Sequence, residues 1–263
     1  MVWLTSLPAG VLVVGGLALA WLVAIGSRLA VRALVPATER DGAYTIAAPL
    51  MPALGAVFAV LMALTLASEA GFLASAQGIV SNEAADASRL AWAATSPRVN
   101  AAPIQAALLD YLRATRAYEW HGSNAAEGDD LATAHAIANL ENVVRAQAAR
   151  PALGTPTSTE LLASLDALTS DRRARLAAAS RELPVLYVIV LVFSGMALIA
   201  NATVLTLRSG LRSALLGGGL SVVIGLSLAL LFALGTPWRG PITVSGHPID
   251  AVVKDLSAGY FHP

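Results

Sequence analysis

The sequence predicts an all-α membrane protein in which four transmembrane helices carry a helical extramembrane domain, inserted between helices two and three. Four apolar runs, at residues 7–25, 49–67, 184–207 and 215–234, contain no Asp, Glu, Lys, Arg or His. At a rise of about 1.5 Å per residue, each run is long enough to cross a hydrocarbon core of about 30 Å. The composition agrees, with 56% hydrophobic and 13% charged residues.

The apolar runs divide the chain into four parts. Residues 1–67 hold the first two transmembrane helices, 68–183 the extramembrane domain, 184–236 the last two helices and 237–263 an interfacial tail. Ion-coupled pumps need an ionisable residue at membrane depth, and the runs have none. A passive pore or a non-conducting scaffold fits the chain better.

Small residues recur at every fourth position of three predicted transmembrane helices. They are Gly16, Ala20 and Ala24; Gly55, Ala59, Ala63 and Ala67; and Gly217, Ser221, Gly225, Ala229 and Ala233. Such stripes let helix backbones approach closely in lipid and predict a tight bundle, although an Ala-rich chain also forms single stripes by chance. Pro49, Pro52 and Pro184 are interpreted as helix starts, where a missing N–H costs little.

The segment 68–183 is predicted to be helical, with 10 Arg and 13 acidic residues. Its first helix continues the second transmembrane helix. The apolar stripe of this helix consists of Phe72, Ala76, Ile79, Ala87 and Leu90. A second helix is expected over 103–120 and a third from Asp129. Thr157 and Glu160 have capping-box spacing, which predicts the start of a fourth.

Glu83 lies on the apolar stripe of the first extramembrane helix. A carboxylate on such a face is costly unless it is paired. We therefore interpret Glu83 as half of a buried ion pair with an Arg of a neighbouring helix, with Arg113 as the candidate. The alternative is a ring of Glu83 side chains at the mouth of an oligomeric pore.

A dense polar edge is predicted on the helix over 103–120. It is formed by Asp110, Tyr111, Arg113, Glu119 and Trp120. Because no second cluster supplies a base and an electrophile, we interpret these residues as structural and expect no enzyme. The four His lack metal-ligand spacing and Cys is absent, so neither a metal nor a cofactor is expected. The net charge of zero gives no indication of nucleic acid.

If a pore exists, the helix at 49–67 is expected to lie nearest its axis. The pore-lining candidates are Gly55, Phe58, Ala59, Leu61 and Ala63. Phe58 and Leu61 have the bulk for a hydrophobic constriction. After the last helix, Trp238 and Arg239 combine an amphipathic ring with a snorkelling cation, as an interfacial anchor does.

Charge in the two short loops predicts the orientation. The first loop holds Arg28, Arg32 and Arg40, and the second holds Arg208 and Arg212. An even number of crossings separates the loops, so they share a side. The positive-inside rule makes that side cytoplasmic and puts the extramembrane domain outside an inner membrane. Four arginines within 172–181 oppose this orientation.

Four motifs carry a family resemblance. They are Glu83-Ala84; Asp110-Tyr111, Arg113 and Glu119-Trp120; the run 172–176 before Leu183-Pro184; and Pro237-Trp238-Arg239-Gly240 with Thr243-Val244-Ser245. Together they resemble the bestrophin-like family of bacterial membrane proteins of unknown function, over nearly the whole chain. By analogy with bestrophins, the resemblance implies a homopentamer with helix two lining an anion-conducting pore, and a cytoplasmic large domain.

The tail departs from the bestrophin pattern. Bestrophin calcium gating uses an acidic run after the fourth helix, whereas this tail has only Asp250 and Asp255, far apart. The first hypothesis is therefore an oligomeric anion channel, and the alternative is a non-conducting accessory or scaffold subunit of a membrane complex. A receptor ranks last. A ring of copies with the helix at 49–67 on its axis would favour the channel.

Overall fold

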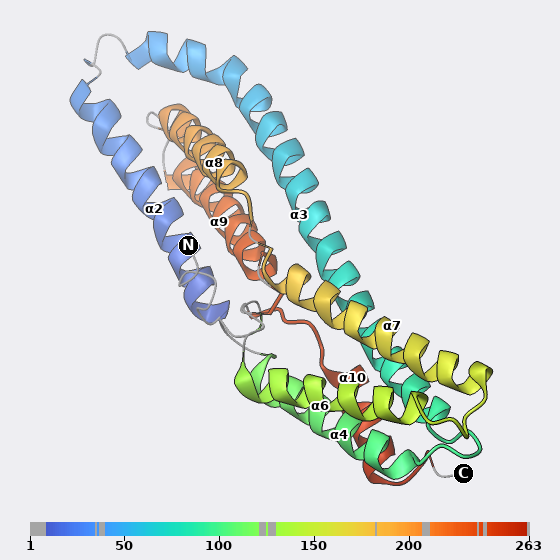
Figure 1. Cartoon of the computed structure of the whole chain (residues 1–263). Helices are drawn as coiled ribbons and strands as arrows, with labels where there is room; N and C mark the ends of the chain where they lie inside the picture. Colours follow the sequence, from blue (N-terminus) through green and yellow to red (C-terminus); the bar gives the residue numbers. More distant parts are fainter. Residues whose placement is uncertain are drawn as a thin grey trace. The chain divides into compact units, whose positions relative to one another are not determined.

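The computed structural model describes residues 9–34, 36, 40–120, 125, 130–181, 183–206, 211–235, 237–238 and 241–261. The described residues form eight helices and no strand, which confirms the all-α prediction for them (Figure 1). The helices are α2 (Ala9–Leu34), α3 (Arg40–Ala93), α4 (Ala101–Tyr118), α6 (Leu131–Ala148), α7 (Thr155–Ala179), α8 (Val185–Thr206), α9 (Leu211–Leu234) and α10 (His247–Ser257).

The helices belong to two compact units. Unit 1 comprises Met1–Gly71, Glu182–Thr236 and Gly240–Ile242, and unit 2 comprises Phe72–Arg181, Pro237–Arg239 and Thr243–Pro263. Among the described residues, four helices are long and apolar enough to cross a membrane. Their spans are Gly10–Ala33, Tyr44–Ala93, Val185–Thr206 and Gly217–Leu234. The described residues of each predicted transmembrane run therefore lie largely on such a helix.

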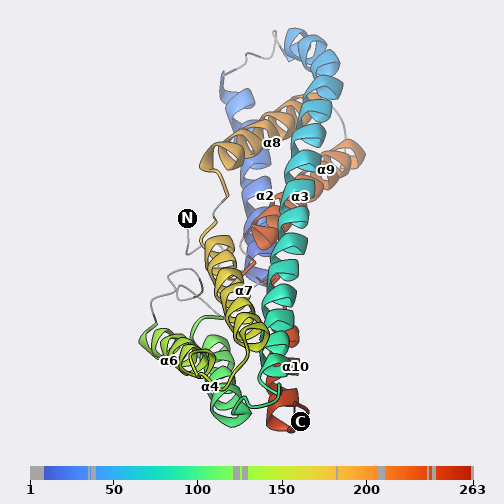
Figure 2. The same cartoon turned by 45° about the vertical axis from the view of Figure 1, so that its right-hand side comes forward.

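In unit 1, α2 packs against α8 and α9, and α8 packs against α9 (Figures 1 and 2). The closest backbone approach is between two glycines of the predicted stripes. A Cβ built on Gly16 would lie 2.6 Å from the carbonyl oxygen of Gly225, so only glycine fits there. The stripe of α3 differs, because a Cβ on Gly55 would meet nothing within 4 Å.

Helix α3 runs unbroken for 54 residues and crosses from unit 1 into unit 2. The predicted continuation of the second transmembrane helix is thus confirmed. The placement of Pro49 and Pro52 at a helix start is wrong, because both lie inside α3. Membrane helices tolerate such prolines where neighbours satisfy freed backbone groups. Near these prolines, Asn201 of α8 donates from Nδ2 to the Ala47 carbonyl at 3.0 Å, although the carbonyls that lose their helical donors are those of Thr45 and Ala48.

Unit 2 packs α4 against α6 and α10, and α6 against α7 (Figure 2). Its core is apolar and draws on most of its helices. Fully buried members include Leu90, Leu108, Tyr111, Leu140, Leu161, Leu168 and Ile249. On α4, Ile104, Leu108 and Leu112 are fully buried, whereas Tyr118 is exposed. Helix α10 buries Ile249 and Val252.

Two predicted helix starts need correction. Asp130 is the N-cap of α6 and not a first-turn residue, because its Oδ1 accepts hydrogen bonds from the backbone N–H groups of Ala132 and Thr133. Helix α7 begins at Thr155 after Gly154, without a side-chain cap. Thr157 therefore lies within the helix, and the predicted capping box does not form. A proline in the first turn of α7 is compatible with this earlier start.

Candidate functional site

The most concentrated chemistry in unit 2 is a buried charge cluster. It consists of Glu83 of α3, Tyr111 of α4, Glu119 directly after α4, and Arg172 and Arg175 of α7. Arg175 donates from Nε to Oε2 of Glu83 at 2.7 Å and from Nη2 to Oε2 of Glu119 at 3.1 Å. Tyr111 donates its hydroxyl to Oε1 of Glu83 at 2.6 Å. Arg172 completes the cluster by donating a hydrogen bond from Nη2 to Oε1 of Glu119.

The charge cluster is desolvated but electrically balanced. The side chains of Glu83, Glu119 and Arg175 are 0% exposed. Two carboxylates face two guanidinium groups, so the formal charges cancel. Removing a charge from water costs several kcal/mol, and the attraction between the partners of a buried pair offsets about that much. The cluster therefore fixes geometry more than it adds stability.

Burial and neighbouring charge shift the proton affinities of two members. Burial raises the pKa of Tyr111 well above its ordinary value. The Glu83 carboxylate, which accepts a hydrogen bond from the Tyr111 hydroxyl, raises this pKa further. Burial alone would lower the pKa of Arg175, but Glu83, Tyr111 and Glu119 outweigh it and raise that pKa. At neutral pH Tyr111 is thus a neutral donor and Arg175 a permanent cation.

A second acidic contact lies beside the charge cluster. Asp171 of α7 lies close enough to Asp86, one turn along α3 from Glu83, for the two carboxyl groups to influence each other. Burial raises the pKa of Asp171, and the nearby Asp86 carboxylate raises it further because two adjacent anions repel. The α3–α7 contact therefore combines an ion pair with a repulsive carboxylate pair.

Arg116 of α4 joins the C-terminal helix α10 to the rest of unit 2. Its guanidinium forms two bonds to Asp250, at 2.7 and 3.0 Å. It also stacks over the ring of Trp120, with Cζ 4.6 Å from the centroid, as the four-residue spacing allows. A Cβ on Gly246 would lie 2.3 Å from the Arg116 Cζ. The guanidinium thus occupies the space that a larger residue at position 246 would need.

The partner of Glu83 is Arg175, and the specific pairing with Arg113 is wrong. Arg113 instead donates to the hydroxyl of Ser257 at 3.3 Å. Of the other residues predicted on the polar edge, Glu119 and Tyr111 join the cluster, Trp120 packs beside it and Asp110 is exposed.

Sequence reasoning missed Arg172 and Arg175 as site residues, because they served only as a signal of orientation and as part of a family motif. The available signal was their spacing, since residues three apart share one face of a helix.

The pore-lining candidates do not share one face of α3. Phe58 is 7% exposed and packs with Met62, Leu191 and Ile224 in the core of unit 1. Gly55 and Leu61 are half-buried, whereas Ala59 and Ala63 are exposed. Because its side chain is buried, Phe58 does not form a constriction on the outer surface of a single copy. It fills the gap in front of Gly195, whose missing side chain admits the ring.

Trp238 does not occupy an interfacial position. It is 3% exposed and belongs to the core of unit 2. Its ring is thus removed from lipid headgroups as well as from water, and the anchor prediction fails for it. The other half of the predicted anchor, Arg239, lies outside the described residues.

The described residues contain no group of three or more His, Cys, Asp or Glu side chains that could hold a metal ion. In the charge cluster each carboxylate is engaged by a guanidinium. The arrangement therefore joins α3, α4 and α7 to one another and presents no free charge to a ligand.

Fold and site together define a helical membrane protein with a second, polar unit organised by buried ion pairs. Residues 18–249 match the family model described as a bestrophin-like domain. The chain therefore belongs to the bestrophin-like family. No curated protein and no solved structure matches it.

Proposed function

We propose that this protein is an oligomeric anion channel of the cell membrane, in which α3 of each copy lines the pore. The observation that carries the proposal is an apolar face of α3 with no partner among the described residues of unit 1. Val57, Val60 and Leu64 point away from the core of unit 1, at 53%, 57% and 66% exposure. Because helical positions three and four apart share a face, these side chains form one continuous strip.

The chemistry of this strip suits a passive pore. It carries no ionisable side chain, so nothing on it binds and releases a coupling ion. Branched apolar side chains at a narrow point gate by excluding water. Family membership supports the same assignment by analogy with bestrophins. Val57, Val60 and Leu64 thus replace Phe58 and Leu61 as the proposed constriction.

We further propose that unit 2 is the extramembrane domain, inserted between the second and third membrane helices, and that it has no enzymatic role. Loop charge favours a non-cytoplasmic side for it, and the bestrophin analogy favours the cytoplasm. Single cysteines at Thr159 of α7 and at Ser209, outside the described residues, test the side because the chain has no native Cys. An impermeant thiol reagent on intact cells should label only position 159 if loop charge is decisive.

The channel proposal is tested by recording currents from purified protein in planar bilayers under a chloride gradient. Val60→Ala should raise the conductance, because a smaller side chain weakens dewetting. Leu22→Ala on α2 is the matched control, since Leu22 is equally apolar and 67% exposed. The pore assignment to α3 fails if both variants conduct like the native protein. No current from native protein, combined with particles that show a single copy in a larger assembly, would favour the accessory-subunit alternative.

A further inference from the structure

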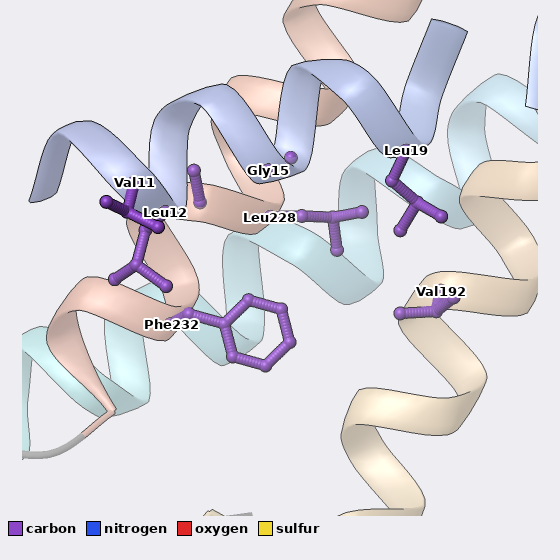
Figure 3. Close-up of a pocket in the computed structure, with 9 residues that line it drawn as sticks. Val11, Leu12, Gly15, Leu19, Val192, Leu228 and Phe232 are labelled. Carbon is purple, nitrogen blue, oxygen red and sulfur yellow. The ribbon is translucent and has the colours of Figure 1, made fainter. Parts of the chain in front are cut away.

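An apolar groove of about 320 Å³ opens in unit 1 between α2, α8 and α9 (Figure 3). Side chains from all three helices converge on it. They include Val11, Gly15 and Leu19 of α2, Val192 of α8, and Leu228 and Phe232 of α9. The lining contains no charged or polar side chain. A ligand that fits this groove must therefore be a hydrocarbon along the length it inserts.

Two glycines give the groove its depth. Gly16 is pressed against Gly225, which sets α2 close to α9. Its neighbour Gly15 lines the groove, and a Cβ there would meet nothing within 4 Å. The absence of a side chain at position 15 leaves space that no described residue of unit 1 fills. Val11 and Leu19 are 49% and 44% exposed, so the groove opens on the outer surface of the membrane helices.

The size of the groove selects among apolar occupants. An α-helix is about 10 Å across, so a helix of a second copy would lie over the groove and could insert only side chains into it. A single extended alkyl chain is narrow enough to lie inside the groove along its length.

We propose that the groove binds one acyl chain of a membrane phospholipid. The surrounding surface is apolar and belongs to helices long enough to span a bilayer, whose interior is made of acyl chains. A chain lying in the groove contacts α2, α8 and α9 at once, whereas a lipid elsewhere on α2 contacts one convex surface. The bound chain thus completes the packing of unit 1. The inference does not depend on channel activity.

Photolabelling tests the acyl-chain site. The full-length protein is reconstituted in vesicles of phosphatidylethanolamine and phosphatidylglycerol, with a trace of phosphatidylethanolamine bearing a diazirine in the middle of one acyl chain. After irradiation, mass spectrometry of peptides should find label several-fold enriched around Val11, Leu19 and Phe232. Leu22 and Val223, which are more exposed than the groove positions, provide the reference for ordinary lipid contact. Even labelling of both sets would overturn the proposal.

Filling the groove provides the matched variants. Gly15→Leu should reduce the enrichment several-fold, and Gly26→Leu, on the same helix in open space, should leave it unchanged. Val11→Trp, at a surface position on the edge of the groove, should also reduce it without disturbing the core. Unchanged enrichment in both groove variants refutes an acyl chain there. If the native protein is unlabelled and removal of residues 1–8 restores labelling, the chain's own N-terminal segment is the occupant and the proposal is wrong.

Discussion

Arg175→Met is the most informative perturbation of the charge cluster. Methionine keeps much of the apolar stem but removes a guanidinium that contacts Glu83 and Glu119 together. Arg172 still pairs with Glu119, whereas Glu83 retains only the hydroxyl of Tyr111. Removing one partner of a fully buried pair costs about 3–5 kcal/mol. At about 2–4 °C per kcal/mol for a protein of this size, the thermal midpoint should fall by about 6–20 °C.

The fall is measured by circular dichroism during heating in detergent, with Arg145→Met as the control. Arg145 is also paired, to Glu141 at 3.3 Å, but its side chain is 67% exposed. An exposed pair four residues apart on a helix contributes about 0.5 kcal/mol or less, so the control should melt within about 2 °C of the native protein. Equal melting shifts in the two variants would refute the claim that burial sets the cost.

A double-mutant cycle separates the ion pair from general loss of packing. Glu83→Leu with Arg175→Met leaves Glu119 and Arg172 as a neutral pair. The second substitution removes the charge that the first one leaves unpaired, so the double variant should cost less than the sum of the single variants. A coupling of about 1–3 kcal/mol is expected for residues in direct contact. Strictly additive effects would mean that the two side chains do not interact in solution.

Three further outcomes follow from burial and close packing. Burial and Glu83 raise the pKa of Tyr111, so the stability that its protonated hydroxyl contributes is intact below about pH 10 and is lost as pH rises above that value. Tyr111→Phe should therefore flatten this alkaline decline in melting temperature. Burial also raises the pKa of Asp171, so ionised Asp171 is less favourable in the folded protein than in the unfolded chain. Asp171→Asn should therefore raise the thermal midpoint at pH 7, and this gain in stability should shrink as the pH falls. Gly16→Ala should destabilise unit 1 by about 1–3 kcal/mol through overpacking, whereas Gly15→Ala should be tolerated. Equal melting of the two glycine variants would contradict the close approach of α2 and α9.

Local patterns in the sequence predicted the helices well. Charge-free runs located the membrane helices, and the glycine stripe anticipated the contact between Gly16 and Gly225. Boundaries were less accurate, because an apolar run marks what is compatible with lipid and not where a helix begins. For that reason the start of α3 at Arg40, before Pro49, was not predicted.

Long-range pairing could not be read from local spacing. Glu83 and Arg175 are 92 positions apart, and only the packing of α7 beside α3 brings them together. Arg113 was nearer in sequence and equally charged, so charge alone did not distinguish the two candidates. The anchor prediction for Trp238 was wrong for a similar reason, since an aromatic residue after a membrane helix suits either a lipid interface or a core.

The charge cluster sets the register between α3 and α7. A slip of α3 by one turn, about 5.4 Å, would bring Ile79 or Ala87 opposite the guanidinium of Arg175 and leave a buried cation unpaired. Apolar contacts along α3 tolerate such a slip far better, because small and branched side chains recur on that face. The double variant at positions 83 and 175 should therefore remain folded, yet exchange backbone amide hydrogens faster over residues 76–90 than Arg145→Met does. Unchanged exchange there would show that apolar packing alone determines the register.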